Sequence, residues 1–154
     1  YKVIDPENYG VINYKKQRIV SISEKPKKPK SNDIVTGLYF YDNTVTELVN
    51  KLKPSKRKEL EISDLNNLYL NKNKLEVLKM KTGMVWLDLG SFDSLLKASQ
   101  YVSIIQERQN IQIGCPEETA FINKWINKKQ FLELVNKSPK NSYGNYLRGI
   151  VKEI

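Results

Sequence analysis

Three short segments carry the side chains best suited to chemistry. They are Glu24-Lys25-Pro26, the aromatic run Val35–Asp42, and Trp86-Leu-Asp88-Leu-Gly90. Each ends or follows a stretch with strand-like alternation, so its polar groups would sit at a strand end. Taken singly, a Glu-Lys-Pro is usually a turn and an Asp-x-Gly is usually the start of a loop. Only their occurrence together can indicate a site.

Two kinds of site are excluded by composition. The chain has no histidine and one cysteine, Cys115. This rules out histidine-based catalytic triads, ordinary histidine-ligated zinc sites and an internal disulfide. A reducing cytoplasm is the compartment that this predicts. There is also no run of about twenty apolar residues and no signal-peptide pattern, so we expect no membrane span.

Positive charge is in excess. The 154 residues include 26 Lys and Arg against 17 Asp and Glu, giving a net charge of +9. Such a charge attracts phosphates, nucleic acid or an anionic membrane without choosing among them. Much of it lies in the runs Lys25–Lys30 and Lys51–Lys58, which solvated loops explain. We therefore do not derive a partner from charge.

The secondary structure that would hold these groups begins with strands. Alternation predicts strands over 9–14 and 18–23, joined as a hairpin, and a loop over 26–29. The β-branched and aromatic residues of 35–41 predict a buried strand. Further strands are predicted over 75–80 and 84–88.

Helices follow the strands. Apolar residues at helical spacing predict a helix over 45–52 and another over 64–70, with the Ser63 hydroxyl as its N-cap. Ser91 is expected to cap a long helix that reaches about Arg108 with an apolar, core-facing stripe.

The last third of the chain is predicted to be helical. Asn127 with Gln130 resembles a capping box for 131–135, and a final helix is expected around 146–151. The fold class is therefore α/β, with a mixed sheet, flanking helices and a helical C-terminal appendage. We place the domains at 1–110 and 111–154.

The order and spacing of the motifs resemble one enzyme family across nearly the whole chain. Together with Tyr9-Gly10-Val11 and Glu59–Asp64, the three segments are similar to glucose-1-phosphate thymidylyltransferases, which are sugar-1-phosphate nucleotidyltransferases. The likeness continues through Glu107–Gln109, Cys115–Glu118 and Tyr143–Tyr146.

The resemblance implies a reaction and a fold. Glucose 1-phosphate would attack the α-phosphorus of dTTP with Mg²⁺ as cofactor, giving dTDP-glucose for dTDP-rhamnose biosynthesis and releasing pyrophosphate. Because a sugar phosphate is already ionised near neutral pH, no histidine base is needed. The fold would be the Rossmann-like one of nucleotide-diphospho-sugar transferases, in a homo-oligomer, with residues 1–110 as its sugar-phosphate side.

Residue roles follow from the same resemblance. Lys25 and Asp88 would be catalytic, Lys25 beside the sugar phosphate and Asp88 as a Mg²⁺ ligand. Glu24 would accept hydrogen bonds from sugar hydroxyls, and Gly10 would let the backbone approach the sugar. The remaining expected substrate contacts are Val35, Tyr39, Arg57, Glu59 and Trp86. Core packing is the alternative for the two aromatics, and a surface ion pair is the alternative for Arg57 and Glu59.

Several positions depart from the family pattern. Lys58 replaces a glycine, Ser63 and Leu89 replace threonines, and Leu89 thereby loses a hydroxyl beside the expected metal ligand. A regulatory nucleotide-sugar site is implied at Gly114, Cys115, Glu118 and Thr119, although Ile122 replaces a basic residue there. A plain capped helix is the alternative.

The family's Gly-rich triphosphate-binding segment has no counterpart, since the seven glycines are scattered. We therefore expect a C-terminal fragment of the enzyme that is inactive alone. Two alternatives stay open: a basic nucleic-acid-binding domain, which we disfavour because no aromatic-basic motif occurs, and a non-catalytic assembly piece.

Overall fold

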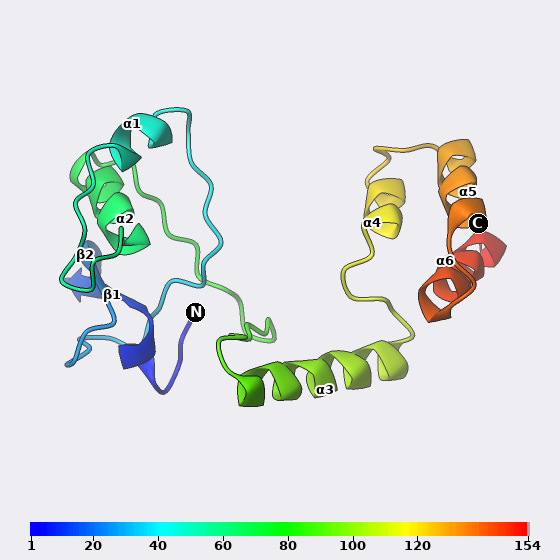
Figure 1. Cartoon of the computed structure of the whole chain (residues 1–154), viewed down its shortest axis with the longest axis horizontal. Coiled ribbons are helices and arrows are strands. Elements are labelled where there is room, and N and C mark those ends of the chain that lie inside the picture. The colour runs from blue at the N-terminus through cyan, green and yellow to red at the C-terminus, as the bar shows by residue number, and fades with distance from the viewer. Residues whose placement is uncertain (154) are drawn as a thin grey trace. The chain divides into compact units, whose positions relative to one another are not determined.

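The computed structural model describes residues 1–153, and two compact units make it up. The first unit is Tyr1–Trp86 and the second begins at Leu87. The first holds a β-hairpin and two helices, and the second holds four helices (Figure 1). The α/β class predicted from the sequence is confirmed. The predicted domain boundary after residue 110 stays a prediction.

The hairpin consists of β1 (Gly10–Lys15) and β2 (Arg18–Glu24), which pair antiparallel as predicted. Lys16 and Gln17 connect them with φ of 47° and 66°. Two consecutive left-handed residues match the right-handed twist of the flanking strands, as in a type I′ turn. The short 3₁₀ helix η1 (Pro6–Asn8) leads into β1.

The segment after the hairpin runs along the other edge of β1. The Ile12 amide donates to the Asp33 carbonyl at 2.9 Å, and the Val35 amide donates to the Gly10 carbonyl at 2.9 Å. The last of these hydrogen bonds to β1 is the one donated by the Val35 amide.

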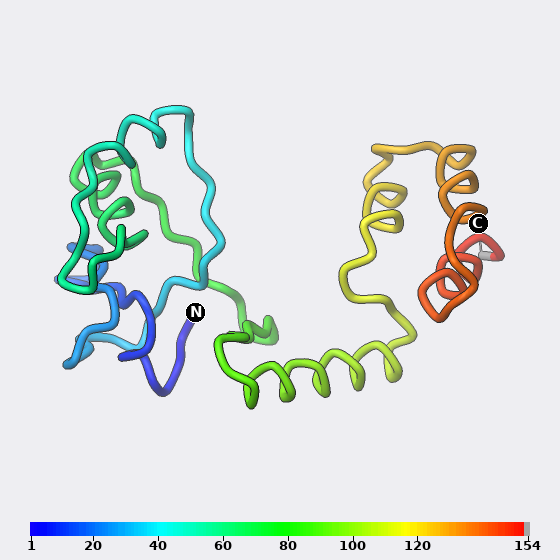
Figure 2. The backbone as a smooth tube through the Cα atoms, in the orientation of Figure 1, coloured from blue at the N-terminus to red at the C-terminus, as the bar shows by residue number. Residues whose placement is uncertain are grey.

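The three further strands predicted over 35–41, 75–80 and 84–88 are not formed, and Figure 2 traces these segments as irregular backbone. Their composition suits a pleated, half-buried surface, but a strand also requires a hydrogen-bonded neighbour. Within residues 1–153 the sheet contains only β1 and β2.

Helices α1 (Val45–Val49) and α2 (Ile62–Asn71) form one apolar cluster of the first unit with the preceding loop. Leu48, Leu65 and Tyr69 are buried together, and Tyr41 stacks on Tyr69 with ring centroids 5.3 Å apart. The N-cap of α2 is Glu61, so the predicted cap at Ser63 is wrong. Ser63 lies inside the first turn, and its hydroxyl instead donates a hydrogen bond to Glu24 at the end of β2.

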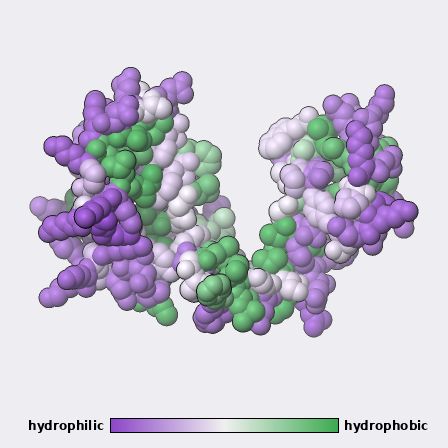
Figure 3. Space-filling model, viewed as in Figure 1, coloured by the Kyte–Doolittle hydropathy of each residue, from purple (hydrophilic) through white to green (hydrophobic). Residues whose placement is uncertain are grey.

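Helix α3 (Phe92–Gln109) opens the second unit with the predicted cap. The Ser91 side chain accepts from the Ser94 amide, and the Ser94 hydroxyl completes a capping box. The apolar stripe of α3 was expected to face a core, but within its unit it faces solvent: Phe92 is 94% exposed and Leu96 58%. Figure 3 shows this apolar surface in green.

Three helices complete the second unit: α4 (Pro116–Ile122), α5 (Lys128–Lys137) and α6 (Ser142–Glu153). The capping box predicted for Asn127 and Gln130 is confirmed. Phe131 of α5 and Leu147 of α6 are fully buried with Cys115. The predicted helical C-terminal part is therefore present, with a core of its own.

None of the described helices combines the length and apolarity needed to cross a bilayer.

Candidate functional site

The hairpin brings together four residues from four parts of the first unit. Gly10 begins β1, and its antiparallel partner Glu24 ends β2. Val35 hydrogen-bonds Gly10 through its amide, and Ser63 of α2 contacts Glu24. We call Gly10, Glu24, Val35 and Ser63 the hairpin cluster. Three of them were predicted site residues.

Gly10 is required here by space. A Cβ at this position would lie 2.6 Å from Val35 Cγ2 and 3.0 Å from Ser63 Oγ. A contact of 2.6 Å does not occur at real Cβ atoms, so a side chain at position 10 would force Val35 or its neighbours to shift. The expected approach of the Gly10 backbone to a sugar stays a prediction.

Ser63 hydrogen-bonds the Glu24 carboxylate. Its hydroxyl donates to Glu24 Oε2 at 2.5 Å, and the side chain is 1% exposed. A bond to an ionised acceptor is stronger than one between neutral groups. Sequence reasoning missed this contact, because it treated Ser63 as a helix cap. The available signal was a small hydroxyl on the buried face of an amphipathic helix.

Tyr39 shares the surroundings of Glu24. Its side chain is partly buried, and this burial raises the pKa of the Tyr39 phenol, with a smaller contribution from the Glu24 carboxylate. The ring also stacks on Tyr41 at 5.9 Å between centroids. The phenol therefore stays protonated near neutral pH and can act as a hydrogen-bond donor beside the cluster.

Lys25 follows directly and has a constrained backbone. Its φ is 39°, in the left-handed region that a lysine rarely adopts. The amide donates to the Tyr9 carbonyl at 3.0 Å, which continues the β1–β2 pairing and holds this conformation. The side chain is exposed, so its ammonium can meet an anion from solvent. Backbone outliers of this kind concentrate at functional sites.

Trp86 fixes the backbone next to Val35. Its indole N–H donates to the Thr36 carbonyl at 3.0 Å, and its ring meets the edge of Tyr9 at 5.2 Å between centroids. It therefore borders the hairpin cluster through Thr36 and Tyr9.

Arg57 and Glu59 are not brought to the cluster by any contact in residues 1–153. They pair with each other at 2.7 Å, and both side chains are about half exposed. Such surface pairs contribute little to stability.

Asp88 lies in the second unit and is exposed. Its carboxylate stays close to the backbone of Gly90, where an added Cβ would lie 3.0 Å from Asp88 Oδ2. Over residues 1–153, no three acidic or cysteine side chains gather to hold a metal ion. Asp88 can therefore offer one carboxylate ligand, with the remaining positions left to water and a substrate.

Three of the four residues expected at a regulatory site are held by neighbours within the second unit. Cys115 is buried, and Thr119 donates to its carbonyl at 2.9 Å. The Glu118 carboxylate accepts from the Tyr146 hydroxyl at 2.8 Å. Gly114 has φ of 75° and open space around it. The regulatory role stays a prediction.

Tyr143 of α6 makes a further contact with α4, because its hydroxyl donates a hydrogen bond to Glu117. Burial raises the pKa of Tyr143, and its hydrogen bonds to Cys115 and Glu117 add to this.

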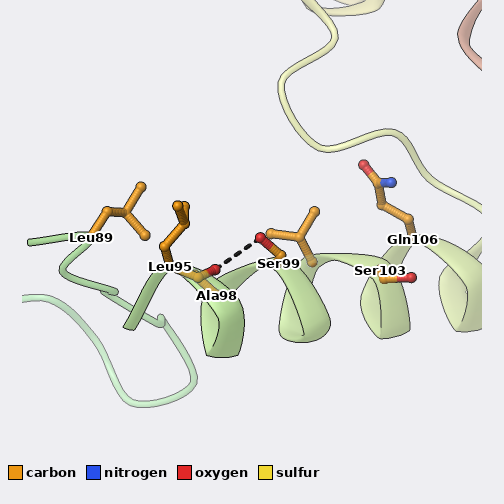
Figure 4. Close-up of a pocket in the computed structure, with 7 residues that line it drawn as sticks. Leu89, Leu95, Ala98, Ser99, Ser103 and Gln106 are labelled. Atoms are coloured by element: carbon orange, nitrogen blue, oxygen red, sulfur yellow. Dashed lines mark hydrogen bonds between the residues drawn. The ribbon is translucent and has the colours of Figure 1, made fainter. Parts of the chain in front are cut away.

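A shallow groove of about 380 Å³ lies along α3 (Figure 4). The Ser99 hydroxyl in it donates back to the Leu95 carbonyl at 2.8 Å. No lining residue is ionisable, so the groove offers no acid or base. Its lining is Leu89, Leu95, Ala98, Ser99, Val102, Ser103 and Gln106.

The chain is similar to known proteins over nearly its whole length. A family model described as nucleotidyl transferase matches residues 1–103. The glucose-1-phosphate thymidylyltransferase of Neisseria meningitidis serogroup A is 46% identical over 154 residues, covering 99% of this chain and 54% of that protein. The enzyme of the same name from Xanthomonas campestris pv. campestris is 45% identical, with 99% and 52% covered.

A solved structure is also similar. It is a Bacillus anthracis protein assigned as a glucose-1-phosphate thymidylyltransferase, in complex with sucrose. The match has a TM-score of 0.57 and 45% identity, and covers 65% of this chain and 40% of that one. The chain thus spans about half the length of the curated relatives it matches.

Proposed function

Because this chain belongs to the nucleotidyl transferase family, we propose that it supplies the sugar-phosphate side of a glucose-1-phosphate thymidylyltransferase. The observation that carries the proposal is the hairpin cluster, in which Ser63 holds the Glu24 carboxylate against the bare backbone of Gly10. The thymidylyltransferases named above, at 45–46% identity, support the same substrate. No observation favours the nucleic-acid-binding alternative.

In this proposal the cluster binds the sugar. The Glu24 carboxylate accepts hydrogen bonds from glucose hydroxyls, and the Tyr39 phenol, whose pKa is raised, donates one. Val35 contributes its main chain, and Trp86 holds the Val35–Thr36 backbone in place. Arg57 and Glu59 stay candidates for outer contacts only.

Lys25 provides the charge beside the sugar phosphate. Its exposed ammonium follows Glu24 directly, so one short segment meets both the hydroxyls and the phosphate of the substrate. A phosphate oxygen of glucose 1-phosphate would form a bond to the α-phosphorus of dTTP, and the bond from that phosphorus to the bridging oxygen would break, releasing pyrophosphate. Lysine favours this by offsetting negative charge between the two phosphates.

Asp88 would hold Mg²⁺ with one carboxylate, which fits a cation that keeps waters and binds substrate phosphates. When bound, this ion neutralises charge on the reacting phosphates.

We extend the proposal to three properties of the whole enzyme. The product dTDP-glucose would enter dTDP-rhamnose biosynthesis, the active form would be a homo-oligomer, and the compartment would be the cytoplasm.

The proposal is tested by titrating the 154-residue chain with glucose 1-phosphate and following amide resonances by NMR. We expect shifts at Gly10, Glu24 and Lys25. Glu24→Gln and Lys25→Gln should each weaken binding on the order of tenfold, because each removes a charge-assisted contact. In the same sample, dTTP, glucose 1-phosphate and Mg²⁺ should release no pyrophosphate, since no Gly-rich loop cradles the triphosphate.

The matched controls are Glu47→Gln on α1 and Lys28→Gln, which make the same charge changes at exposed positions. Both should bind like the original chain. Equal weakening by controls and site variants, or no shift at the cluster, would show that the cluster is not the sugar site. Pyrophosphate release would refute the expected inactivity of the chain alone.

A further inference from the structure

Asn67 of α2 holds the backbone of β2 two residues before Glu24. We propose that Asn67 is a positioning residue, which sets where the Glu24 carboxylate stands in the sugar-phosphate site. The geometry of α2 and β2 supports the positioning of Glu24 by Asn67. The consequence of that positioning for sugar-phosphate binding rests on the proposed function.

The backbone of Ile22 would be unpaired without α2. Antiparallel strands alternate between residues that exchange hydrogen bonds with the partner and residues that point away from it. The bond from the Lys25 amide to the Tyr9 carbonyl fixes this alternation, so Ile22 directs its N–H and C=O to the outer edge of β2. Since Ile22 is 3% exposed, both groups need protein partners.

Asn67 satisfies both groups with one amide. The Ile22 N–H donates to Asn67 Oδ1 at 2.8 Å, and Asn67 Nδ2 donates to the Ile22 carbonyl at 2.7 Å. The partners themselves determine the orientation of the amide, because only its oxygen can accept from an N–H. Asn67 thus occupies the place that a neighbouring strand would take.

The hydrogen bonds of Asn67 to Ile22 and the hydrogen bond of Ser63 to Glu24 act as a pair. Ser63 and Asn67 are four residues apart on α2, about 6 Å along its axis. Ile22 and Glu24 are two residues apart on β2, about 6.6 Å along the strand. Because these spacings match, α2 holds β2 at two successive points, the backbone of Ile22 and the carboxylate of Glu24.

Ser63 alone cannot fix the carboxylate. Its single bond reaches the end of a flexible side chain, which can follow the hydroxyl while the backbone moves. The two hydrogen bonds from Asn67 to Ile22 restrict movement of the β2 backbone, so the Cα atom of Glu24 is held in place. Fixing both ends of a contact reduces the ordering cost of ligand binding.

The experiment compares Asn67→Ala with two other α2 variants of the same chain. Leu68→Ala removes an apolar side chain that packs on the Leu48, Leu65 and Tyr69 core, so it should destabilise α2 without removing a hydrogen bond to β2. Asn71→Ala removes an exposed asparagine at the end of the helix. The readouts are thermal unfolding, amide exchange at Ile22 and Lys25, the amide resonances of Glu24, and the affinity for glucose 1-phosphate.

We expect Asn67→Ala to speed exchange at Ile22, to leave Lys25 protected by Tyr9 and to shift the Glu24 resonances. Its affinity for glucose 1-phosphate should fall on the order of tenfold. Leu68→Ala should lower the melting temperature but keep the affinity within about twofold, because both Asn67 hydrogen bonds to Ile22 remain. Asn71→Ala should match the original chain in every readout.

Three outcomes would overturn the inference: fast Ile22 exchange in the original chain, unchanged Glu24 resonances in Asn67→Ala, or equal losses of affinity in Asn67→Ala and Leu68→Ala. If the original chain binds no glucose 1-phosphate while Asn67→Ala still shifts Glu24 and frees Ile22, the proposed function fails and the positioning of Glu24 stands.

Discussion

At the scale of single residues, polar side chains in the first unit are held by specific partners. Ser63 holds Glu24, Asn67 holds Ile22, and Asn13 donates to the hydroxyls of Ser21 and Ser23. A buried polar group left without a partner costs more than the bond contributes, so such residues tolerate little change. The hairpin is therefore specified by polar contacts as well as by its apolar face.

Asp33 gives a pH dependence at this scale. Partial burial raises the pKa of its carboxyl, but hydrogen bonds from Lys79 at 2.7 Å and Tyr14 at 2.8 Å outweigh this and hold the pKa below the ordinary 3.8. A lowered folded-state pKa stabilises the fold above 3.8, and this contribution is lost as the pH falls through the folded value.

We therefore expect Asp33→Asn to reduce stability at neutral pH and to flatten its fall on acidification below 3.8, measured by urea unfolding across pH. Glu76→Gln, the same loss of one charge at an exposed position, serves as the control. If both variants retain the acid profile of the original chain, the Asp33 contacts do not contribute to the fold in solution.

At the scale of elements, the helices of the second unit are bounded by local signals. Asn127 and Gln130 bond each other's backbone at the start of α5, which carries Phe131 and Val135 into the core. Tyr143 and Tyr146 of α6 reach the neighbouring glutamates of α4. Capping sets where α5 begins, and the tyrosines set how α6 lies on α4.

Removing the cap should weaken α5 by a predictable amount. Asn127→Ala is expected to cost about 1 kcal/mol of stability in the second unit, because the Gln130 amide loses its acceptor. Urea unfolding measures the change. Asn136→Ala, at an exposed position within the same helix, should be neutral or slightly stabilising, since alanine is the better helix former. A neutral Asn127→Ala would mean that the cap does not limit α5.

At the scale of the whole molecule, each unit has its own core. Leu48, Leu65 and Tyr69 belong to the first unit, and Cys115, Phe131, Val135 and Leu147 belong to the second. The hairpin cluster belongs entirely to the first. Damage to the second core should therefore leave the hairpin cluster formed.

Phe131→Ala tests this independence. The side chain is fully buried, so its loss should cost about 3–5 kcal/mol within the second unit. Amide exchange should increase over α4 to α6 while the β1–β2 amides keep their protection. Leu48→Ala should do the converse, exposing amides of α1 and α2. Loss of protection along the whole chain in either variant would show that the units unfold as one.

Much of the local structure of this protein could be predicted from its sequence. The hairpin, the caps at Ser91 and Asn127 and the helical last third follow from contacts between residues near in the chain, which turn chemistry and helical spacing encode. The motif order also indicated the family, and Gly10, Glu24 and Val35 do meet.

The meeting of distant segments, in contrast, is a property of the folded chain. Residues 35–41, 75–80 and 84–88 have strand-like composition but form no strand, because pairing depends on a neighbour that local sequence cannot supply. The Ser63 hydroxyl bonds Glu24, 39 positions away in the sequence, instead of capping its own helix. Asn67 bonds Ile22, 45 positions away. Such contacts depend on how a helix docks on a strand edge, which has no signature in spacing along the chain.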